Sequence, residues 1–336
     1  MNAIALRVVR AITETSDAVS LELVAESGQP LPYRPGQFLT LRIPSDRTGS
    51  VARSYSLSSA PHEDSPLKVT VKRTAGGYGS NWLCDNAGPG TTIESLPPAG
   101  IFTPSSLDTD LLLLAAGSGI TPVISILKSA LAQGSGSCTL IYANRDEQSV
   151  IFADELTELA TAYPDRLVVV HWLESVQGLP SLPTLTGLLA NWSDRELFMC
   201  GPTPFMDAVV DAAAALDMDR GRVHVEKFVS LAGDPFADIE VEDTGDTAGV
   251  EVELDGATHE FAWPRSSVLL DVLLARGVAA PYSCREGACS ACVCRVVDGE
   301  VKLLRNEVLE REDLADGYVL ACQAVPVTDT VRVTYE

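Results

Sequence analysis

The pattern of apolar and polar residues changes twice along the chain. Up to about residue 104, short runs alternate between apolar and polar positions, as in 5–12, 18–25 and 38–44, and Gly, Pro or Asp separates them. Alternation with a period of two is typical of strands that bury one face. Many short strands at close spacing predict an antiparallel β-barrel over residues 1–104.

Between residues 105 and 233 the apolar residues form continuous runs instead. The run 111–117 predicts a buried strand, and comparable runs follow at 138–145, 166–175 and 196–202, with helical patterns between them. This alternation predicts a parallel, doubly wound α/β sheet. Ligands bind beyond the carboxyl ends of such strands. The segments GSGITP, ANR and CGP, which end three of the runs, therefore predict a nucleotide site.

The remaining residues, 249–336, return to short strand-like runs. Two pairs of runs surround Asp255-Gly256 and Asp298-Gly299, and each pair predicts a hairpin. The helical pattern that follows the first pair has Ser266 or Ser267 as its predicted cap. Two hairpins, one helix and a last strand suit a small β-grasp domain.

Charge excludes some classes of function. The net charge is −22, divided as zero over residues 1–104, −9 over 105–233 and −13 over 234–336. Without a basic excess to neutralise phosphates, nucleic-acid binding is not expected. Residues 234–248 are acidic and aperiodic and predict a linker. The N-terminus shows no signal-peptide pattern, and no run of about 18 apolar residues occurs. We therefore expect a cytoplasmic monomer that is not inserted into a membrane.

Four cysteines carry the most specific motif. Cys284, Cys289 and Cys292 form a C-x4-C-x2-C loop, and Cys322 follows after 29 residues. This is the spacing of plant-type [2Fe–2S] ligands, and the small residues in the loop allow backbone N–H groups to approach the cluster. A zinc site is the alternative, but zinc sites usually contain paired C-x2-C units. Cys294 lies on the outgoing strand and is expected to be a buried thiol.

Two further segments are informative only in combination. In ARSYSLSSAP, alternation places Arg53 and Tyr55 on one face of a strand and Ser54 and Ser56 on the other. In TAGGYGSNWLCDN, a glycine-rich loop leads into a helix, with Ser80 as its predicted cap, and such a helix start suits a phosphate. Taken separately, a polar edge strand and an ordinary glycine loop are equally good interpretations.

In that order, about 25 residues apart, the two segments resemble the flavin-binding motifs of the ferredoxin–NADP reductase superfamily. The resemblance implies that Arg53 pairs with the flavin pyrophosphate, that Tyr55 packs against the flavin, and that Ser56 lies near the ring edge where hydride arrives. The further residues that it places at the flavin are Ser54, Val71, Lys72, Gly79 and Ser80.

The resemblance continues through a G-x-G-x-T-P turn and a C-G-P motif. It implies that Gly117, Gly119 and Thr121 contact the dinucleotide, and that Cys200 and Gly201 lie beside the nicotinamide. A buried inert thiol is the alternative for Cys200.

The VHVEKF segment matches the part of the family's chain that returns to the flavin, which would bring Glu226 close to the nicotinamide. The implied catalytic set is therefore Ser56, Cys200 and Glu226. Arg145 is the basic residue near a possible 2′-phosphate, but acidic residues follow it, so we expect NADH, with NADPH as the alternative.

The order of the three regions resembles the reductase components of multicomponent oxygenases. The segment VEKFVSLAGDPF is most similar to the group that includes the 3-ketosteroid 9α-hydroxylase and phenylacetyl-CoA oxygenase reductases. The resemblance implies electron flow from NADH to FAD, in preference to FMN, then to a [2Fe–2S] cluster and to a terminal oxygenase, which we expect to be of the Rieske type. The alternatives are a reductase for a non-oxygenase partner and a redox-sensing protein.

Overall fold

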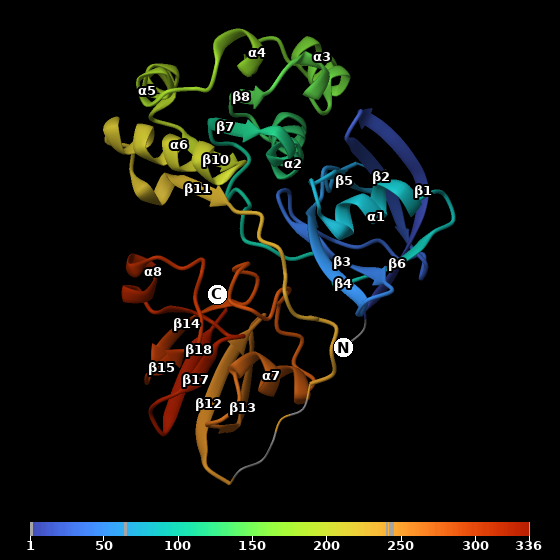
Figure 1. Cartoon of the computed structure of the whole chain (residues 1–336). Helices are drawn as coiled ribbons and strands as arrows, with labels where there is room; N and C mark the ends of the chain where they lie inside the picture. The colour runs from blue at the N-terminus through green and yellow to red at the C-terminus, as the bar shows by residue number, and fades with distance from the viewer. Residues whose placement is uncertain (1–2, 64–65, 240, 242–244, 336) are drawn as a thin grey trace.

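The computed structural model describes residues 3–63, 66–239, 241 and 245–335. The chain forms a barrel, a parallel-sheet domain and a C-terminal domain, each with a hydrophobic core (Figure 1). Within the described residues, no helix is both long enough and apolar enough to cross a membrane.

The barrel is an antiparallel sheet in which the described strands follow the order β4-β3-β6-β1-β2-β5. Its strands are β1 (Ile4–Thr15), β2 (Ala18–Ala25), β3 (Phe38–Ser45), β4 (Gly49–Ser56), β5 (Leu67–Lys72) and β6 (Thr92–Ser95). The sheet curls until a bridge between Leu57 and Val69 joins its two edges. Helix α1 (Tyr78–Asn86) packs on it through the buried Leu83.

The second domain has the predicted parallel sheet, in the order β11-β10-β7-β8-β9. Its strands are β7 (Leu111–Ala116), β8 (Cys138–Asn144), β9 (Leu167–Leu173), β10 (Glu196–Cys200) and β11 (Val223–Glu226). The helices are α2 (Ile120–Gln133), α3 (Ala153–Ala162), α4 (Glu174–Gln177), α5 (Leu182–Leu189) and α6 (Thr203–Ala215). Helices α2 and α3 cover one face of the sheet, and α5 and α6 cover the other.

The C-terminal domain is a mixed sheet in the order β13-β12-β18-β14-β16, with a separate β15-β17 pair. The elements are β12 (Thr247–Leu254), β13 (Ala257–Pro264), α7 (Leu269–Ala275), β14 (Val293–Asp298), β15 (Val301–Leu303), α8 (Arg311–Ala315), β16 (Tyr318–Leu320), β17 (Ala324–Pro326) and β18 (Thr330–Thr334). The first hairpin is confirmed: Asp255 and Gly256 both have positive φ, as a two-residue turn of this kind requires.

Three local predictions were wrong. Strand β14 pairs with β16 and β18 instead of forming a hairpin with β15 across Asp298-Gly299. Neither predicted serine caps α7, whose N-cap is Val268. Strand β12 begins at Thr247, so the last two residues of the predicted linker belong to the sheet. For β14, pairing with distant strands decided the outcome, which local patterns do not encode.

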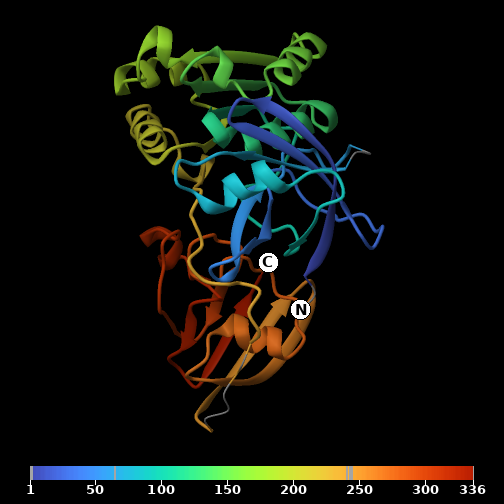
Figure 2. The same ribbon diagram turned by 45° about the vertical axis from the view of Figure 1, so that its right-hand side comes forward.

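The barrel and the parallel-sheet domain are joined by partly buried ion pairs. Lys128 of α2 is 6% exposed and lies 3.3 Å from Glu63 of the barrel and 2.9 Å from Glu155 of α3. Lys68 of β5 also pairs with Glu155, at 3.2 Å. Figure 2 shows these two domains together above the C-terminal domain. Removing one partner from a buried ion pair is costly, so this junction is expected to be rigid.

Candidate active site

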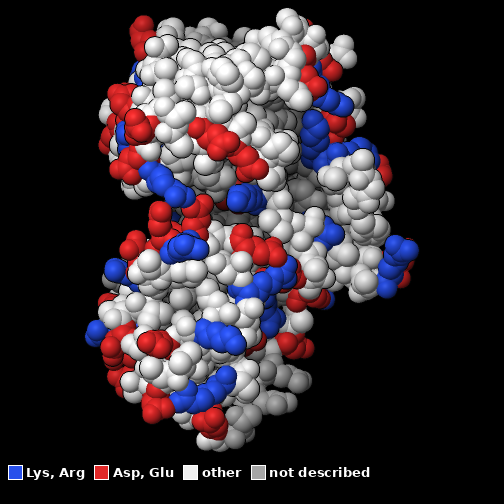
Figure 3. All heavy atoms as spheres, turned by 60° about the vertical axis from the view of Figure 1, so that its left-hand side comes forward, with Lys and Arg blue, Asp and Glu red and all other residues white. Residues whose placement is uncertain are grey.

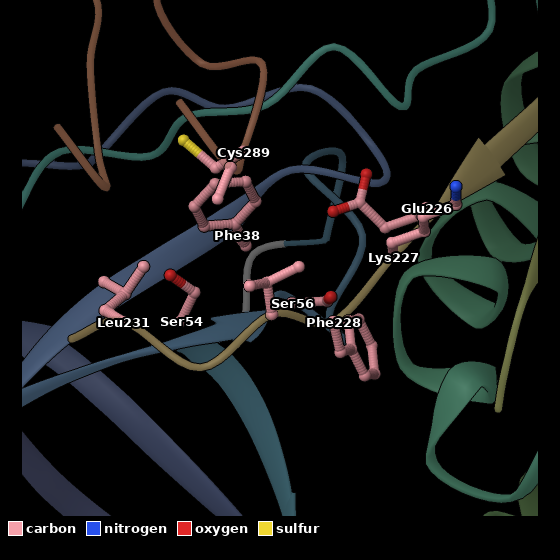
Figure 4. A pocket seen from close by; sticks show the side chains of 10 residues that line it. Phe38, Ser54, Ser56, Glu226, Lys227, Phe228, Leu231 and Cys289 are labelled. Carbon is pink, nitrogen blue, oxygen red and sulfur yellow. The ribbon is translucent and has the colours of Figure 1, made fainter. Parts of the chain in front are cut away.

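One pocket brings together all three domains (Figure 4). Phe38, Ser54 and Ser56 come from barrel strands, Glu226 ends β11, and Ala288 and Cys289 belong to the cysteine loop. The remaining lining residues, Lys227, Phe228, Val229 and Leu231, lie on an irregular segment between β11 and the C-terminal domain. We call this segment, residues 227–236, the strap.

The alternation predicted for β4 is confirmed. Ser54 and Ser56 face the pocket. Arg53 and Tyr55 point to the other side, toward Gly79: a Cβ atom on Gly79 would lie 2.9 Å from Arg53 Cγ and 3.7 Å from Tyr55 Oη. Burial raises the pKa of Tyr55, so its hydroxyl keeps its proton and can donate a hydrogen bond.

The helix start at which a phosphate is predicted to bind is formed as α1, but its cap differs from the prediction. The helix begins at Tyr78 with Gly77 as N-cap, and among the described residues no side chain caps its first amides and no acidic residue lies in its first turn. Ser80 is therefore not the cap; its Oγ accepts a hydrogen bond from Thr74 N at 3.0 Å. An arginine beside uncapped helix amides suits the pyrophosphate of FAD.

Arg53 keeps donors for such a ligand. Its Nη1 donates to the carbonyls of Ala52 and Leu231, at 2.7 and 3.0 Å. A guanidinium has five N–H donors, so others are left for phosphate oxygens. The contact with Leu231 also ties the strap to the barrel.

The β5 residues contribute in two different ways. The Val71 side chain is fully buried in the barrel core, so its backbone is the part that a ligand could reach. Lys72 lies 3.7 Å from Asp17 and points toward Gly117 of the parallel-sheet domain. Lys72 is thus placed between the proposed flavin and nicotinamide sites.

The glycine turn after β7 packs directly on the C-G-P turn after β10. A Cβ atom on Gly119 would lie 2.0 Å from Cys200 O and 2.7 Å from Gly201 N, which no side chain could occupy. Gly117 has a φ of +54°. Thr121 is buried and its hydroxyl donates to Ser118 O at 3.1 Å, so it stabilises the turn.

Cys200 of β10 pairs with Glu226 of the neighbouring strand β11. Burial raises the pKa of Glu226 to about 8, and burial together with the Glu226 charge raises the pKa of Cys200 well above its usual value. Both groups are therefore protonated at neutral pH. The pocket-facing Glu226 (Figure 4) is a proton-holding group beside the position implied for the nicotinamide.

Arg145 does not line the pocket. It follows β8, is 67% exposed, and lies 3.7 Å from Asp17, the carboxylate that also pairs with Lys72. Asp146 and Glu147 come next, and Glu174 follows the adjacent strand β9. Acidic residues therefore lie at the carboxyl ends of β8 and β9, and the arginine there, Arg145, is paired with Asp17.

The four predicted cluster cysteines lie together in the folded chain. The Cys284 thiol has hydrogen-bonding neighbours in Cys289 and Cys322, and Cys322 has another in Cys292. The contacts with Cys289 and Cys322 lower the pKa of Cys284 well below its usual value. Backbone amides point at the sulfurs: Glu286 N and Ala288 N lie 3.3 and 3.4 Å from Cys284 Sγ.

This donor set fits a two-iron cluster. Within the described part of the chain, no group of three or more His, Cys, Asp or Glu is arranged around one metal position. Four thiols linked in a row instead suit [2Fe–2S], in which two irons share four thiolates and amide N–H groups bond the sulfurs. Gly287, with a φ of +75° and a Cβ position only 2.9 Å from Arg305 O, accommodates the tight loop.

The cysteine loop is docked on the barrel. Ala291 and Cys289 pack with Phe38 and Ala99, and Cys284 and Ala288 pack with Ala52 and Leu231. The hydroxyl groups of Thr40 and Ser283 lie 2.6 Å apart in this buried contact. Sequence reasoning missed Phe38, Thr40 and Ser283, although the position of Ser283 next to Cys284 was a usable signal.

Family models match the chain in three places. An oxidoreductase FAD-binding domain matches residues 5–103, an oxidoreductase NAD-binding domain matches 113–211, and a 2Fe-2S iron-sulfur cluster binding domain matches 252–327. The cofactors expected from the sequence, FAD, NAD and [2Fe–2S], are confirmed at this level.

Individual relatives extend over nearly the whole chain. The 3-ketosteroid-9-alpha-monooxygenase ferredoxin reductase component of Rhodococcus rhodochrous is 58% identical, with 98% of this chain and 96% of that protein covered. One of the proteins that make up the 1,2-phenylacetyl-CoA epoxidase of Escherichia coli K12 is 34% identical, with 98% and 97% covered.

Among solved structures, phthalate dioxygenase reductase, a modular structure for electron transfer from pyridine nucleotides to [2Fe–2S], has a TM-score of 0.60 and 26% identity, with 99% and 98% covered. The predicted resemblance and fold class are thus confirmed. The chain belongs to the family of oxygenase reductase components that join an FAD-binding, an NAD-binding and a 2Fe-2S cluster-binding domain in one polypeptide.

Proposed function

We propose that this protein is the NADH-dependent reductase component of a 3-ketosteroid-type monooxygenase system. The observation that carries the proposal is the pocket in which Ser56, Glu226 and Cys289, one residue from each domain, meet. When bound there, the flavin supplies the conversion of a two-electron hydride into single electrons, which an iron–sulfur cluster can carry.

The residues have distinct proposed roles. Arg53, with the first turn of α1, holds the pyrophosphate, and Tyr55 and the Val71 backbone position the flavin. Ser56 and the neutral Glu226 lie where hydride arrives, and Cys200 with Gly201 provides a tightly packed surface for the nicotinamide. The raised pKa of Glu226 lets it hold a proton at this position. The docked cysteine loop supplies the exit for electrons.

An anaerobic NADH titration of the holoenzyme tests the proposal. Flavin absorbance and cluster absorbance should both decrease, and Cys289→Ser should retain NADH–dye reduction while losing reduction of a one-electron protein acceptor. Equal loss of both activities in Cys289→Ser would contradict separate modules. A wild-type cluster that stays oxidised beside reduced flavin would contradict the route, and a wild type that reduces cytochrome c poorly would favour a sensor.

The preference for NADH rests on the charges after β8 and β9. Asp17 lies within 3.7 Å of both Arg145 and Lys72, so it competes with a 2′-phosphate for these two cations. Replacing Asp17 by Asn should therefore lower the KM for NADPH about tenfold, as one charge-assisted contact allows, and change the KM for NADH little. Asp46→Asn, at an exposed turn of the same barrel, is the control. An unchanged NADPH KM would exclude this role for Asp17.

The proposed partner is a Rieske-type terminal oxygenase acting on a steroid. The support is the 58% identity to a 3-ketosteroid-9-alpha-monooxygenase reductase component. Mixing the NADH-reduced protein with such an oxygenase should produce the electron paramagnetic resonance signal of a reduced Rieske centre, and no transfer would reject this partner.

We further propose a cytoplasmic monomer. One chain supplies every described wall of the pocket, and Cys84, Cys138, Cys200 and Cys294 are free thiols, as in a reducing compartment. Light scattering should give the mass of one chain.

A further inference from the structure

The C-terminal domain contacts both of the other domains, in two different ways. Its contact with the parallel-sheet domain is an exposed group in which Arg220 reaches Glu310 and Glu312 of the α8 region. Figure 3 shows charged side chains of both signs along this junction. Exposed ion pairs contribute little. The position of the cysteine loop therefore depends on the strap and on the contact with the barrel, which combines apolar packing with the buried hydroxyl pair of Thr40 and Ser283.

Besides the apolar packing of Leu231 against the cysteine loop, a carboxylate of the loop is hydrogen-bonded to the strap. Glu286, between the ligands Cys284 and Cys289, accepts hydrogen bonds from the backbone amides of Ala232, at 3.1 Å, and Gly233. On its other side the strap is held by Arg53, which donates to Leu231 O at 3.0 Å. The cysteine loop and the proposed pyrophosphate arginine are thus attached to adjacent residues of the strap.

Gly233 is fitted to this contact. A Cβ atom there would lie 2.8 Å from Glu286 Oε1 and would displace the carboxylate. Asp234 and Phe236 extend the attachment, because Arg42 of β3 pairs with Asp234 at 3.7 Å and lies 5.5 Å above the Phe236 ring. Arg285 donates to Ala237 O at 2.9 Å just beyond the strap.

We propose that Glu286 is a positioning residue that clamps the cysteine loop to the strap, so that Cys289 faces the pocket lined by Ser54 and Ser56. Charge-assisted hydrogen bonds to two backbone amides fix both the distance and the orientation of the loop. The proposal rests on the proposed function, because it assumes that electrons leave the pocket through this loop.

Two variants remove the clamp from opposite sides. Glu286→Ala deletes the acceptor, and Gly233→Ala displaces it without altering the cysteine loop. In each holoenzyme we expect NADH-dependent flavin reduction to be unchanged and cluster reduction to be slowed about tenfold or more, as expected for losing two charge-assisted hydrogen bonds. Glu286→Gln keeps an acceptor oxygen and should recover part of the rate. Glu260→Gln, exposed on β13 of the same domain, is the matched control and should behave as wild type.

Two readouts separate positioning from structural damage. Hydrogen exchange at the amides of residues 232 and 233 should accelerate in both variants, and the paramagnetic resonance spectrum of the dithionite-reduced cluster should match wild type. Wild-type rates of cluster reduction in both variants would overturn the proposal, as would unchanged exchange at these amides.

If Glu286→Ala loses iron, the rate of cluster reduction and the hydrogen exchange of Gly233→Ala alone test the proposal. Failure of the wild-type cluster to accept electrons from NADH would instead reject the proposed function.

Discussion

Burial sets the protonation of the groups around the nicotinamide position. Glu226 carries its proton at neutral pH because removal from water disfavours the carboxylate, and its neighbour Cys200 is a neutral thiol for the same reason. Cys200 is thus unsuited to act as a thiolate nucleophile. Its contribution is its backbone, which contacts Gly119 and closes the two turns against each other.

The pKa of Glu226 makes stability depend on pH. The folded state holds this proton up to about pH 8, whereas the unfolded state loses it near 4.5. Between these values the unfolded state binds fewer protons, so stability falls as pH rises, by about 5 kcal/mol in full. Glu226→Gln should therefore unfold at a higher temperature than wild type at pH 9 and lose this difference at pH 4. A constant difference between the melting temperatures of the two proteins from pH 4 to 9 would contradict this effect of Glu226.

At the scale of elements, α1 and the cysteine loop rely on glycine for different reasons. Gly287 permits a left-handed backbone in the loop, while Gly79 permits α1 to approach β4 closely. This approach places the amides of the first turn of α1 beside Arg53. Helix amides and guanidinium therefore converge where a pyrophosphate would bind.

Gly79→Ala should weaken flavin binding. The added methyl group would lie 2.9 Å from both Arg53 Cγ and Ile43 Cδ1 and would move the arginine from its position. We expect the dissociation constant for FAD to rise about tenfold or more, the loss expected for one charge-assisted contact. Gly88→Ala, where no atom lies within 4 Å of the added methyl group, serves as control. Equal FAD affinity in the two variants, measured by fluorescence titration, would argue against this function of α1.

At the scale of the molecule, a rigid pair of domains carries a third that is attached by fewer buried polar contacts. Lys128 and its carboxylates lock the barrel to the parallel sheet, whereas the C-terminal domain depends on the strap and on Thr40 with Ser283. In the docked arrangement the cysteine loop faces the barrel, with Cys284, Cys292 and Cys322 buried. We predict that delivery of electrons to a large partner requires release of this domain.

A disulfide between positions 40 and 283 should test this release. The two hydroxyl oxygens are 2.6 Å apart, so Thr40→Cys with Ser283→Cys can form a bond without moving the backbone far. The oxidised double variant should keep NADH-dependent cluster reduction but reduce cytochrome c more than about tenfold more slowly, because the undocked state becomes inaccessible. Dithiothreitol should restore the rate, and each single variant is a control. Full activity of the oxidised form would show that undocking is unnecessary.

Local patterns along the chain were enough to predict the three domains and the classes of cofactor that they bind. Alternation with a period of two predicted the barrel, continuous apolar runs predicted the parallel sheet, and the C-x4-C-x2-C spacing predicted the cluster ligands, because these properties are local along the chain. Alternation alone correctly separated Ser54 and Ser56 from Arg53 and Tyr55.

The tertiary structure decided which surfaces meet. Thr40 and Ser283 are 243 residues apart in the chain, and Glu286 finds its partners 53 and 54 residues away. Local periodicity does not predict contacts between residues so far apart in the chain. It also does not predict that β14 pairs with β16 and β18 instead of β15. Association of separate domains depends on the complementarity of whole surfaces, so the pocket between the three domains, and the clamp that closes it, became visible only in the folded chain.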